Sequence, residues 1–336
     1  MKISIISPSI NSSKNLSNLL EGLKIQNNQD FEVILVLSSA SKKMYSILEK
    51  NLQFFGSRLK FIINDKRKST QSDIVCAFHM VKASYVHIMF SNNTLRPYFV
   101  QELIKNLDEH KPDVFEFKPR LVGTFRWKPH ARLESMKLYK KDKNPEFIAY
   151  SFPFIFNKIF KKSLISQFIK HKPKETTDTK FCLELTYFLL INAQTYVYDD
   201  RRIVREFISS TTWLNPINFI GEFKIIENFL NVNNIKLNQE LDYARIYFLQ
   251  IFLTSLLDSW KFRILGGFGV IKDRINYNEK RTEKFINDLY KYLEKAHNEE
   301  QLFFNTNIYI HKDNQETKKL IYLPPKSEWK DIINDL

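Results

Sequence analysis

A short basic run is the first group of residues whose types and spacing could do chemistry. Lys66, Arg67 and Lys68 stand together just before an apolar helical pattern. Lysine and arginine side chains can clamp a phosphate group without a metal ion. A solvated basic turn is the alternative interpretation. The seven histidines show no spacing typical of metal ligands, so we expect no histidine metal site.

Asp178 is an acidic residue that directly precedes an apolar helical pattern at Phe181–Ile191. Side-chain oxygens at the start of a helix accept hydrogen bonds from its first backbone N–H groups. Asp178 could therefore cap this helix, with Thr176 and Thr177 as alternative caps.

Strands and helices alternate through the first third of the chain. This alternation predicts an α/β fold with a mostly parallel sheet and flanking helices. Ligands then bind at the carboxyl ends of the strands, near Pro8, Leu37 and Phe90. Apolar runs predict strands at Ile3–Ile6, Val33–Leu37, Phe61–Ile63, Tyr85–Phe90 and Val114–Phe117. Apolar residues at helical spacing predict helices around Leu16–Leu23 and Ile74–Val81.

Helical patterns dominate the C-terminal third, with long stretches at Phe223–Val232, Leu241–Trp260 and Glu283–Lys295. We expect two domains, an α/β domain over residues 1–215 and a helical domain over residues 216–336. Within the first of these domains, the segment Gly123–Asn144 is basic and irregular. Such a segment is usually a solvated loop, and the alternative is a lid over a ligand.

The net charge of the 336-residue chain is +14, and its composition is that of a globular protein. A surface of this charge attracts nucleic acid, anionic lipid and phosphorylated ligands alike. The longest apolar tract, Ile246–Leu257, is shorter than the roughly 18 residues of a membrane span. Two cysteines and a strand-like N-terminus without a signal peptide favour a cytoplasmic location. Peripheral association with the inner face of the cell membrane is the related hypothesis.

Several short segments resemble one known family, in the family's own order. Ile3–Asn11 resembles its opening strand, which ends in Pro-x-Tyr-Asn, and Phe31–Val36 resembles the strand before its Asp-Asp-Gly-Ser turn. Lys82–Val86 resembles the Lys-Gly-Glu-Tyr-Ile before its Asp-x-Asp motif, and Asn157–Phe160 repeats its Asn-Lys-Ile-Phe. This ordered set extends over residues 1–212 and resembles family 2 glycosyltransferases. The resemblance implies a GT-A fold and transfer of a sugar from a nucleotide sugar.

The resemblance also implies where the donor binds. Pro8 and Asn11 match the opening motif, although Ile10 replaces its tyrosine. Leu37 and Ser38 align with the carboxylates that contact the nucleoside in the family and cannot replace them. We therefore expect the nucleotide sugar near a set of positions that the alignment or the basic run supplies, namely Pro8, Asn11, Ser38, Lys68, Asn92 and Arg205. For Arg205, which matches a family Tyr-Arg-x4-Ser-x-Thr segment, a surface arginine in a basic run is the alternative.

The metal motif is degraded. Phe90, Ser91 and Asn92 align with Asp-x-Asp, whose carboxylates bind Mg²⁺ or Mn²⁺ in the family. Phenylalanine cannot bind a metal ion, and no aspartate or glutamate occurs between Asp73 and Glu102. We expect no metal ligands in this chain, and Mg²⁺ or Mn²⁺ is implied only by the family.

One catalytic position of the family is retained. The family's Glu-Asp pair aligns with Thr177 and Asp178, so the resemblance implies that Asp178 is the general base.

Three hypotheses follow for the function. The first is a divergent glycosyltransferase that uses a nucleotide sugar and a membrane lipid or surface glycan acceptor, with an impaired donor site. The second is a catalytically inactive relative that serves as a binding or partner subunit, because the nucleoside, metal and diphosphate positions are lost together. The third is a nucleic-acid-binding protein, but no recognisable motif supports a specific nucleic acid partner.

Overall fold

The computed structural model describes residues 1–66, 68–123, 125–174, 180–208, 214–263, 279–334 and 336. The chain folds into two compact units. Unit 1 comprises residues 1–119, 134–143 and 154–207, and unit 2 comprises residues 120–133, 144–153 and 208–336. Each unit is thus assembled from segments that are separated in the sequence. The division of the chain at residue 215 into two domains stays a prediction.

Unit 1 is built on an eight-stranded sheet with the order β3-β2-β1-β4-β8-β5-β9-β7. The first four strands of this order are parallel neighbours, with Ile5 opposite both Val33 and His87. Strands β1, β2 and β4 are buried and mainly apolar, as expected when helices cover both faces of a sheet, whereas β3 at the edge of the sheet is only partly buried. Their bounds are β1 (Ile3–Ile10), β2 (Phe31–Ser38), β3 (Leu59–Asn64) and β4 (Tyr85–Ile88).

The second half of the sheet mixes strand directions. Strand β8 is antiparallel to both of its neighbours, β4 and β5, and β7 at the end of the sheet is antiparallel to β9. The remaining pair, β5 with β9, is parallel. These strands are β5 (Val114–Phe117), β7 (Leu138–Lys140), β8 (Lys158–Lys161) and β9 (Thr195–Asp199). The mostly parallel sheet predicted from the sequence is confirmed.

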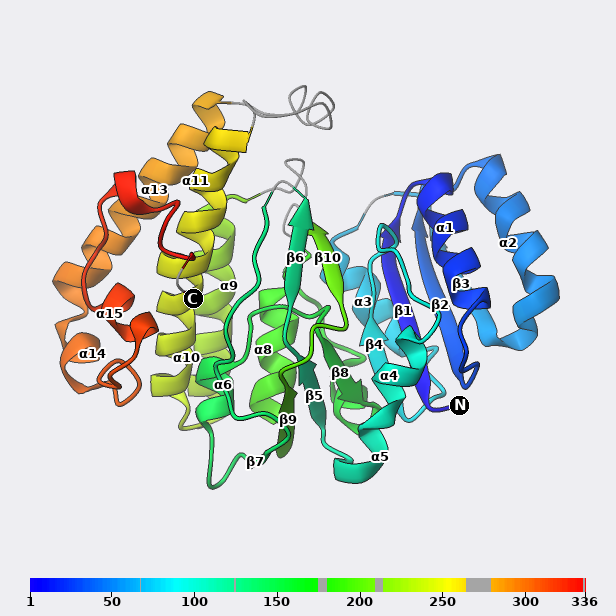
Figure 1. Ribbon diagram of the computed structural model, residues 1–336, viewed down its shortest axis with the longest axis horizontal. Coiled ribbons are helices and arrows are strands. Elements are labelled where there is room, and N and C mark those ends of the chain that lie inside the picture. Colours follow the sequence, from blue (N-terminus) through cyan, green and yellow to red (C-terminus); the bar gives the residue numbers. More distant parts are fainter. Residues whose placement is uncertain (67, 124, 175–179, 209–213, 264–278, 335) are drawn as a thin grey trace. The chain divides into compact units, whose positions relative to one another are not determined.

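Helices connect the parallel strands of unit 1. Helix α1 begins after Ser12, whose hydroxyl accepts a hydrogen bond from Asn15 N, and it buries a leucine stripe against the sheet. Figure 1 shows α1 and α2 on one side of β1–β3 and α3 on the other, as right-handed crossovers require when the strand order reverses after β3. The helices of unit 1 are α1 (Ser13–Lys24), α2 (Lys42–Phe55), α3 (Thr70–Phe78), α4 (Phe99–Lys105), α5 (Leu107–His110), α7 (Lys162–Ile165) and α8 (Leu183–Asn192).

Strand β1 is longer than the sequence predicts, because it continues through Pro8 to Ile10. Its pairing with β2 changes register between Ser7 and Ile10, and Ser9 has a positive φ of 54°. A bulge of this kind accommodates proline, which has no N–H to donate to a neighbouring strand. The bulge brings Ser9 to the carboxyl end of the sheet.

Unit 2 is mainly helical, which confirms the helical C-terminal region. Among the helices that the structure describes, none is long and apolar enough to cross a membrane. A π-helical segment, Tyr247–Leu253, joins two of the helices into one continuous run. The elements of unit 2 are β6 (Arg120–Gly123), α6 (Glu146–Tyr150), α9 (Pro216–Val232), α10 (Asn238–Ile246), α11 (Thr254–Arg263), α13 (Glu279–Glu299), α14 (Gln301–Thr306) and α15 (Gln315–Ile321). Strand β10 (Arg205–Ile208) begins in the last residues of unit 1.

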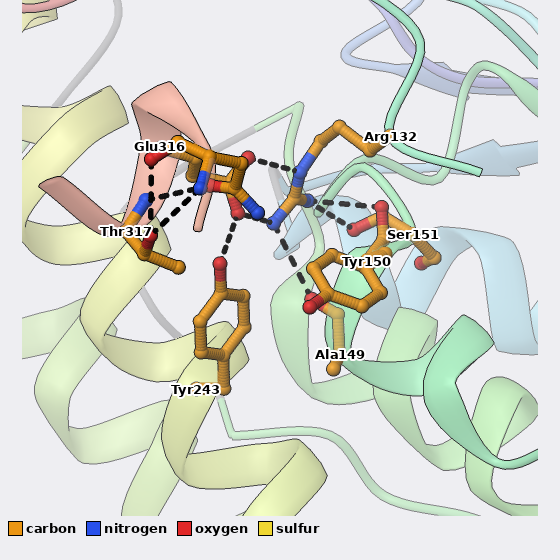
Figure 2. A network of polar contacts seen from close by, with 8 residues as sticks. Arg132, Ala149, Tyr150, Ser151, Tyr243, Glu316 and Thr317 are labelled. Carbon is orange, nitrogen blue, oxygen red and sulfur yellow. Dashed lines mark hydrogen bonds and ion pairs between the residues drawn. The ribbon is translucent and has the colours of Figure 1, made fainter. Parts of the chain in front are cut away.

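A buried ion pair ties three parts of unit 2 together (Figure 2). The Arg132 guanidinium donates to both carboxylate oxygens of Glu316, each over 2.7 Å, and the Tyr243 hydroxyl donates to the same carboxylate over 2.6 Å. Arg132 also donates to the carbonyls of Tyr150 and Ser151 and lies 3.4 Å from the Tyr247 ring centre. Burial alone disfavours the charged guanidinium, but the Glu316 charge outweighs it and raises the pKa of Arg132. For Arg132, the expectation of a solvated loop residue is therefore wrong.

Candidate functional site

The carboxyl ends of β1–β4 meet at one edge of the unit 1 sheet. The connections from β1 and from β3 leave in opposite directions, so the strand order switches between β1 and β4. In open α/β sheets, ligands bind in the crevice at such a switch point. Two clusters of polar side chains lie at this edge.

The first cluster, which we call the Ser9–Asp73 cluster, joins the ends of β1 and β3 to helix α3. The fully buried Asp73 carboxylate accepts from Ser9 N over 3.1 Å, from Ser9 Oγ over 2.8 Å and from Asn64 Nδ2 over 2.9 Å. Burial raises the pKa of the Asp73 carboxyl, because the bonds from Ser9 and Asn64 and the charge of Lys68 offset the loss of solvent only in part. The cluster fixes Ser9 in its left-handed conformation.

Two further hydroxyls lie near the same edge. The Oγ atoms of Ser7 and Ser38 are buried and have no hydrogen-bond partner among the described residues. A buried hydroxyl without a partner costs free energy unless a ligand or water molecule satisfies it. Ser38 and Asn64 lie opposite one another in adjacent strands, next to the first cluster.

The second cluster, the Lys180 cluster, lies beyond the carboxyl end of β4. The Lys180 ammonium donates to Asn92 Oδ1 over 2.9 Å, to Glu206 Oε1 over 2.5 Å and to the Phe207 carbonyl over 2.9 Å. The other carboxylate oxygen of Glu206 accepts from Asn93 Nδ2 over 2.9 Å. Glu206 is fully buried, whereas the Lys180 side chain is 18% exposed.

Phe90 forms the apolar floor of the Lys180 cluster. Its ring centre lies 4.9 Å from Lys180 Nζ, a distance typical of a cation–π contact. The ring also packs edge-on against Phe156, which stacks on Phe154. Phe90 is thus a core side chain whose outer face covers part of the ammonium.

The predicted donor-binding residues have different surroundings at this edge. Pro8 and Ser38 are buried in β1 and β2, Asn11 is exposed just after β1, and Lys68 is exposed before α3. Asn92 belongs to the Lys180 cluster. Arg205 is exposed on β10, beside the inward-facing Glu206. Binding by these residues stays a prediction.

Asp178, the predicted base, lies outside the described residues. Helix α8 begins at Leu183 and has Cys182 at its N-cap, with no side-chain capping bond. The capping alternative also concerns Thr176, Thr177 and Asp178, which lie outside the described residues, and it stays a prediction.

Three site residues were not expected from the sequence, namely Asp73, Lys180 and Glu206. The stretch around Asn92 carries no acidic residue of its own, but Glu206 reaches it from β10. The sequence gives no signal for this, because apolar and polar residues do not alternate over Val204–Ile208, where Phe207 is exposed and Glu206 is buried.

The basic segment Gly123–Asn144 is divided between the two units. In unit 2, its exposed members Arg126, Lys128 and His130 line a cavity of about 630 Å³ together with Arg120. The cavity lining is therefore positively charged, and Arg132 serves a structural role instead.

Comparison with known proteins decides the family. The model of glycosyl transferase family 2 matches residues 4–168, which contain β1–β4 and the Ser9–Asp73 cluster. This part of the chain belongs to glycosyl transferase family 2.

Solved structures share the fold of the chain. S. aureus TarS 1–349 in complex with UDP-GlcNAc matches with 17% identity and a TM-score of 0.60, over 99% of this chain and 91% of that one. A longer TarS chain matches with 18% identity and a TM-score of 0.57, over 88% of this chain and 55% of that one. The mannosyltransferase PcManGT from Pyrobaculum calidifontis, in complex with GDP-Man and Mn²⁺, matches with 11% identity and a TM-score of 0.50, over 86% and 84%. No curated protein matches the chain.

The residues at the family 2 metal position do not fit a divalent cation. Asn92 and Asn93 offer neutral amides, and both oxygens of Glu206 are already engaged by Lys180 and Asn93. Among the residues with described positions, no three histidine, cysteine or acidic side chains are grouped as a metal site requires.

Proposed function

We propose that this chain is a glycosyltransferase that binds a nucleotide sugar at the carboxyl edge of β1–β4. The observation that carries the proposal is the pair of polar clusters at the switch point of a family 2 domain. The unsatisfied hydroxyls of Ser7 and Ser38 support it, because a bound ligand can satisfy them. TarS, which shares the fold, binds UDP-GlcNAc, so UDP-GlcNAc is the first donor to test.

The proposed reaction breaks the bond between the sugar's anomeric carbon and the diphosphate. An acceptor hydroxyl forms the new bond to that carbon, the nucleoside diphosphate leaves with the electron pair, and Asp178 takes the hydroxyl proton. The sequence resemblance alone supports this role for Asp178. We propose a membrane lipid or a surface glycan as the acceptor and peripheral binding to an anionic membrane surface, since the net charge is +14.

An inactive relative that only binds is the second candidate. One observation favours it: the single carboxylate in the Lys180 cluster is neutralised by an ion pair within the protein. Donor binding without turnover would support this candidate over the first.

Calorimetric titration with UDP-GlcNAc and GDP-mannose, followed by measurement of nucleoside diphosphate release, tests the proposal. We expect one donor to bind and to be turned over once a suitable acceptor is supplied. Asp178→Asn should leave donor binding unchanged and lower turnover by at least a factor of 100. If neither donor binds under any condition, the proposed function is wrong. If binding is retained and Asp178→Asn has normal turnover, Asp178 is not the base.

A further inference from the structure

Lys180 holds a positive charge at the place where a family 2 enzyme binds its metal ion. Its ammonium is surrounded by three oxygen atoms at 2.5–2.9 Å, from Asn92, Glu206 and Phe207. Two of these residues come from β10, and Asn92 follows β4, whose carboxyl end borders the switch point. The ammonium thus lies in an oxygen shell like that of a bound cation, but it belongs to the chain.

We propose that the Lys180 ammonium replaces the divalent cation and binds the donor diphosphate without metal. This inference rests on the proposed function, because it concerns the same nucleotide-sugar site.

The charges of the cluster support the replacement. In the family pattern, two carboxylates and one divalent cation sum to zero. Here Glu206 and Lys180 also sum to zero, and the neutral Asn92 and Asn93 stand beside them. A lysine ammonium is a compact point charge that binds phosphate well. The replacement of the family's acids and the presence of Lys180 therefore leave the net charge of the site at zero, as in the family pattern.

The ammonium can be released to a ligand without breaking the ion pair. Its three N–H groups are all used, by Asn92, Glu206 and Phe207. Asn92 is exposed and neutral, so its side chain can turn away and leave one N–H for a phosphate oxygen. Glu206 is held by Asn93 as well and stays in place to orient Lys180. The Phe90 ring, 4.9 Å from Lys180 Nζ, shields part of the ammonium from water, which strengthens an electrostatic contact.

The test measures binding of UDP and GDP by calorimetry, once in EDTA and once in Mn²⁺. We expect the dissociation constants of the wild-type chain in the two buffers to agree within about twofold, which corresponds to about 0.4 kcal/mol. Lys180→Met removes the charge and keeps the apolar stem, so it should weaken binding at least tenfold. Lys162→Met, which removes an exposed lysine charge from α7 in the same unit, should bind like wild type.

A second variant is the control for misfolding, because Lys180→Met leaves the buried Glu206 carboxylate without its ion-pair partner and could destabilise the chain. The double variant Lys180→Met/Glu206→Gln has no buried charge in the cluster and should melt near the wild-type temperature, yet still bind at least tenfold more weakly. Lys180→Arg should retain binding in EDTA.

The outcomes separate this inference from the proposed function. Binding that occurs only with Mn²⁺, or a folded double variant that binds like wild type, overturns the role of Lys180 and leaves the function standing. Absence of binding by the wild-type chain in both buffers overturns both.

Discussion

Replacing Arg132 by methionine should strongly destabilise unit 2. The change removes the two hydrogen bonds to Glu316 and those to the Tyr150 and Ser151 carbonyls. It also leaves a carboxylate that is only 11% exposed with the Tyr243 hydroxyl as its remaining donor among these contacts. Breaking a buried ion pair from one side costs about 3–5 kcal/mol. For a unit of this size, that loss lowers the melting temperature by about 10 °C.

The assay is urea unfolding, followed by far-ultraviolet circular dichroism and by tryptophan fluorescence, since Trp127 and Trp329 are buried in unit 2. The control is Arg126→Met, which removes an exposed arginine from the same segment and should change the free energy of unfolding by no more than about 0.5 kcal/mol. The double variant Arg132→Met/Glu316→Met removes both charges and should recover part of the loss. A loss below about 1 kcal/mol for Arg132→Met, or a double variant no more stable than the single one, would refute this reasoning.

Two further predictions concern stability in unit 1. Burial lowers the pKa of His87 to about 4, so between pH 6.5 and 4 the unfolded chain binds a proton that the folded chain does not. The free energy of unfolding should therefore fall by about 2–3 kcal/mol from pH 7.5 to 4.5. Urea titrations at the two pH values should show a smaller fall for His87→Asn. An equally steep loss in the variant would exclude His87 as the cause. Gly56 has φ 54° and ψ −133°, with no atom within 4 Å of an added Cβ, so Gly56→Ala should cost about 1–3 kcal/mol through backbone strain alone. No change in the urea midpoint would contradict that assignment.

The fold could be predicted because its signals are local. Leu16, Leu19, Leu20 and Leu23 form one face of a helix in any context, and the run Val33–Leu37 is apolar enough to require a covered strand. These patterns depend on residues a few positions apart, and the structure retains both elements with slightly longer bounds.

The site was harder to predict because its contacts link distant residues. Lys180 meets Asn92 across 88 positions, and Asn93 meets Glu206 across 113. An ungapped comparison with the family showed which acids were missing at Phe90 and Asn92, but it could not show which residue had taken over the charge. The sequence predicts a loop position for Arg132 for the same reason, since its partner Glu316 lies 184 positions away.

The interleaved order of the two units has a consequence for synthesis of the protein. Residues 120–133 and 144–153 leave the ribosome long before α10 and α15, against which Arg132 and Tyr150 are buried. Until residue 316 has emerged, a guanidinium and several aromatic rings of the nascent chain lack their permanent neighbours. Since chains are made at roughly 5–20 residues per second, this exposed interval lasts on the order of ten seconds or more. Chaperone demand should therefore peak while the second half of the chain is being translated.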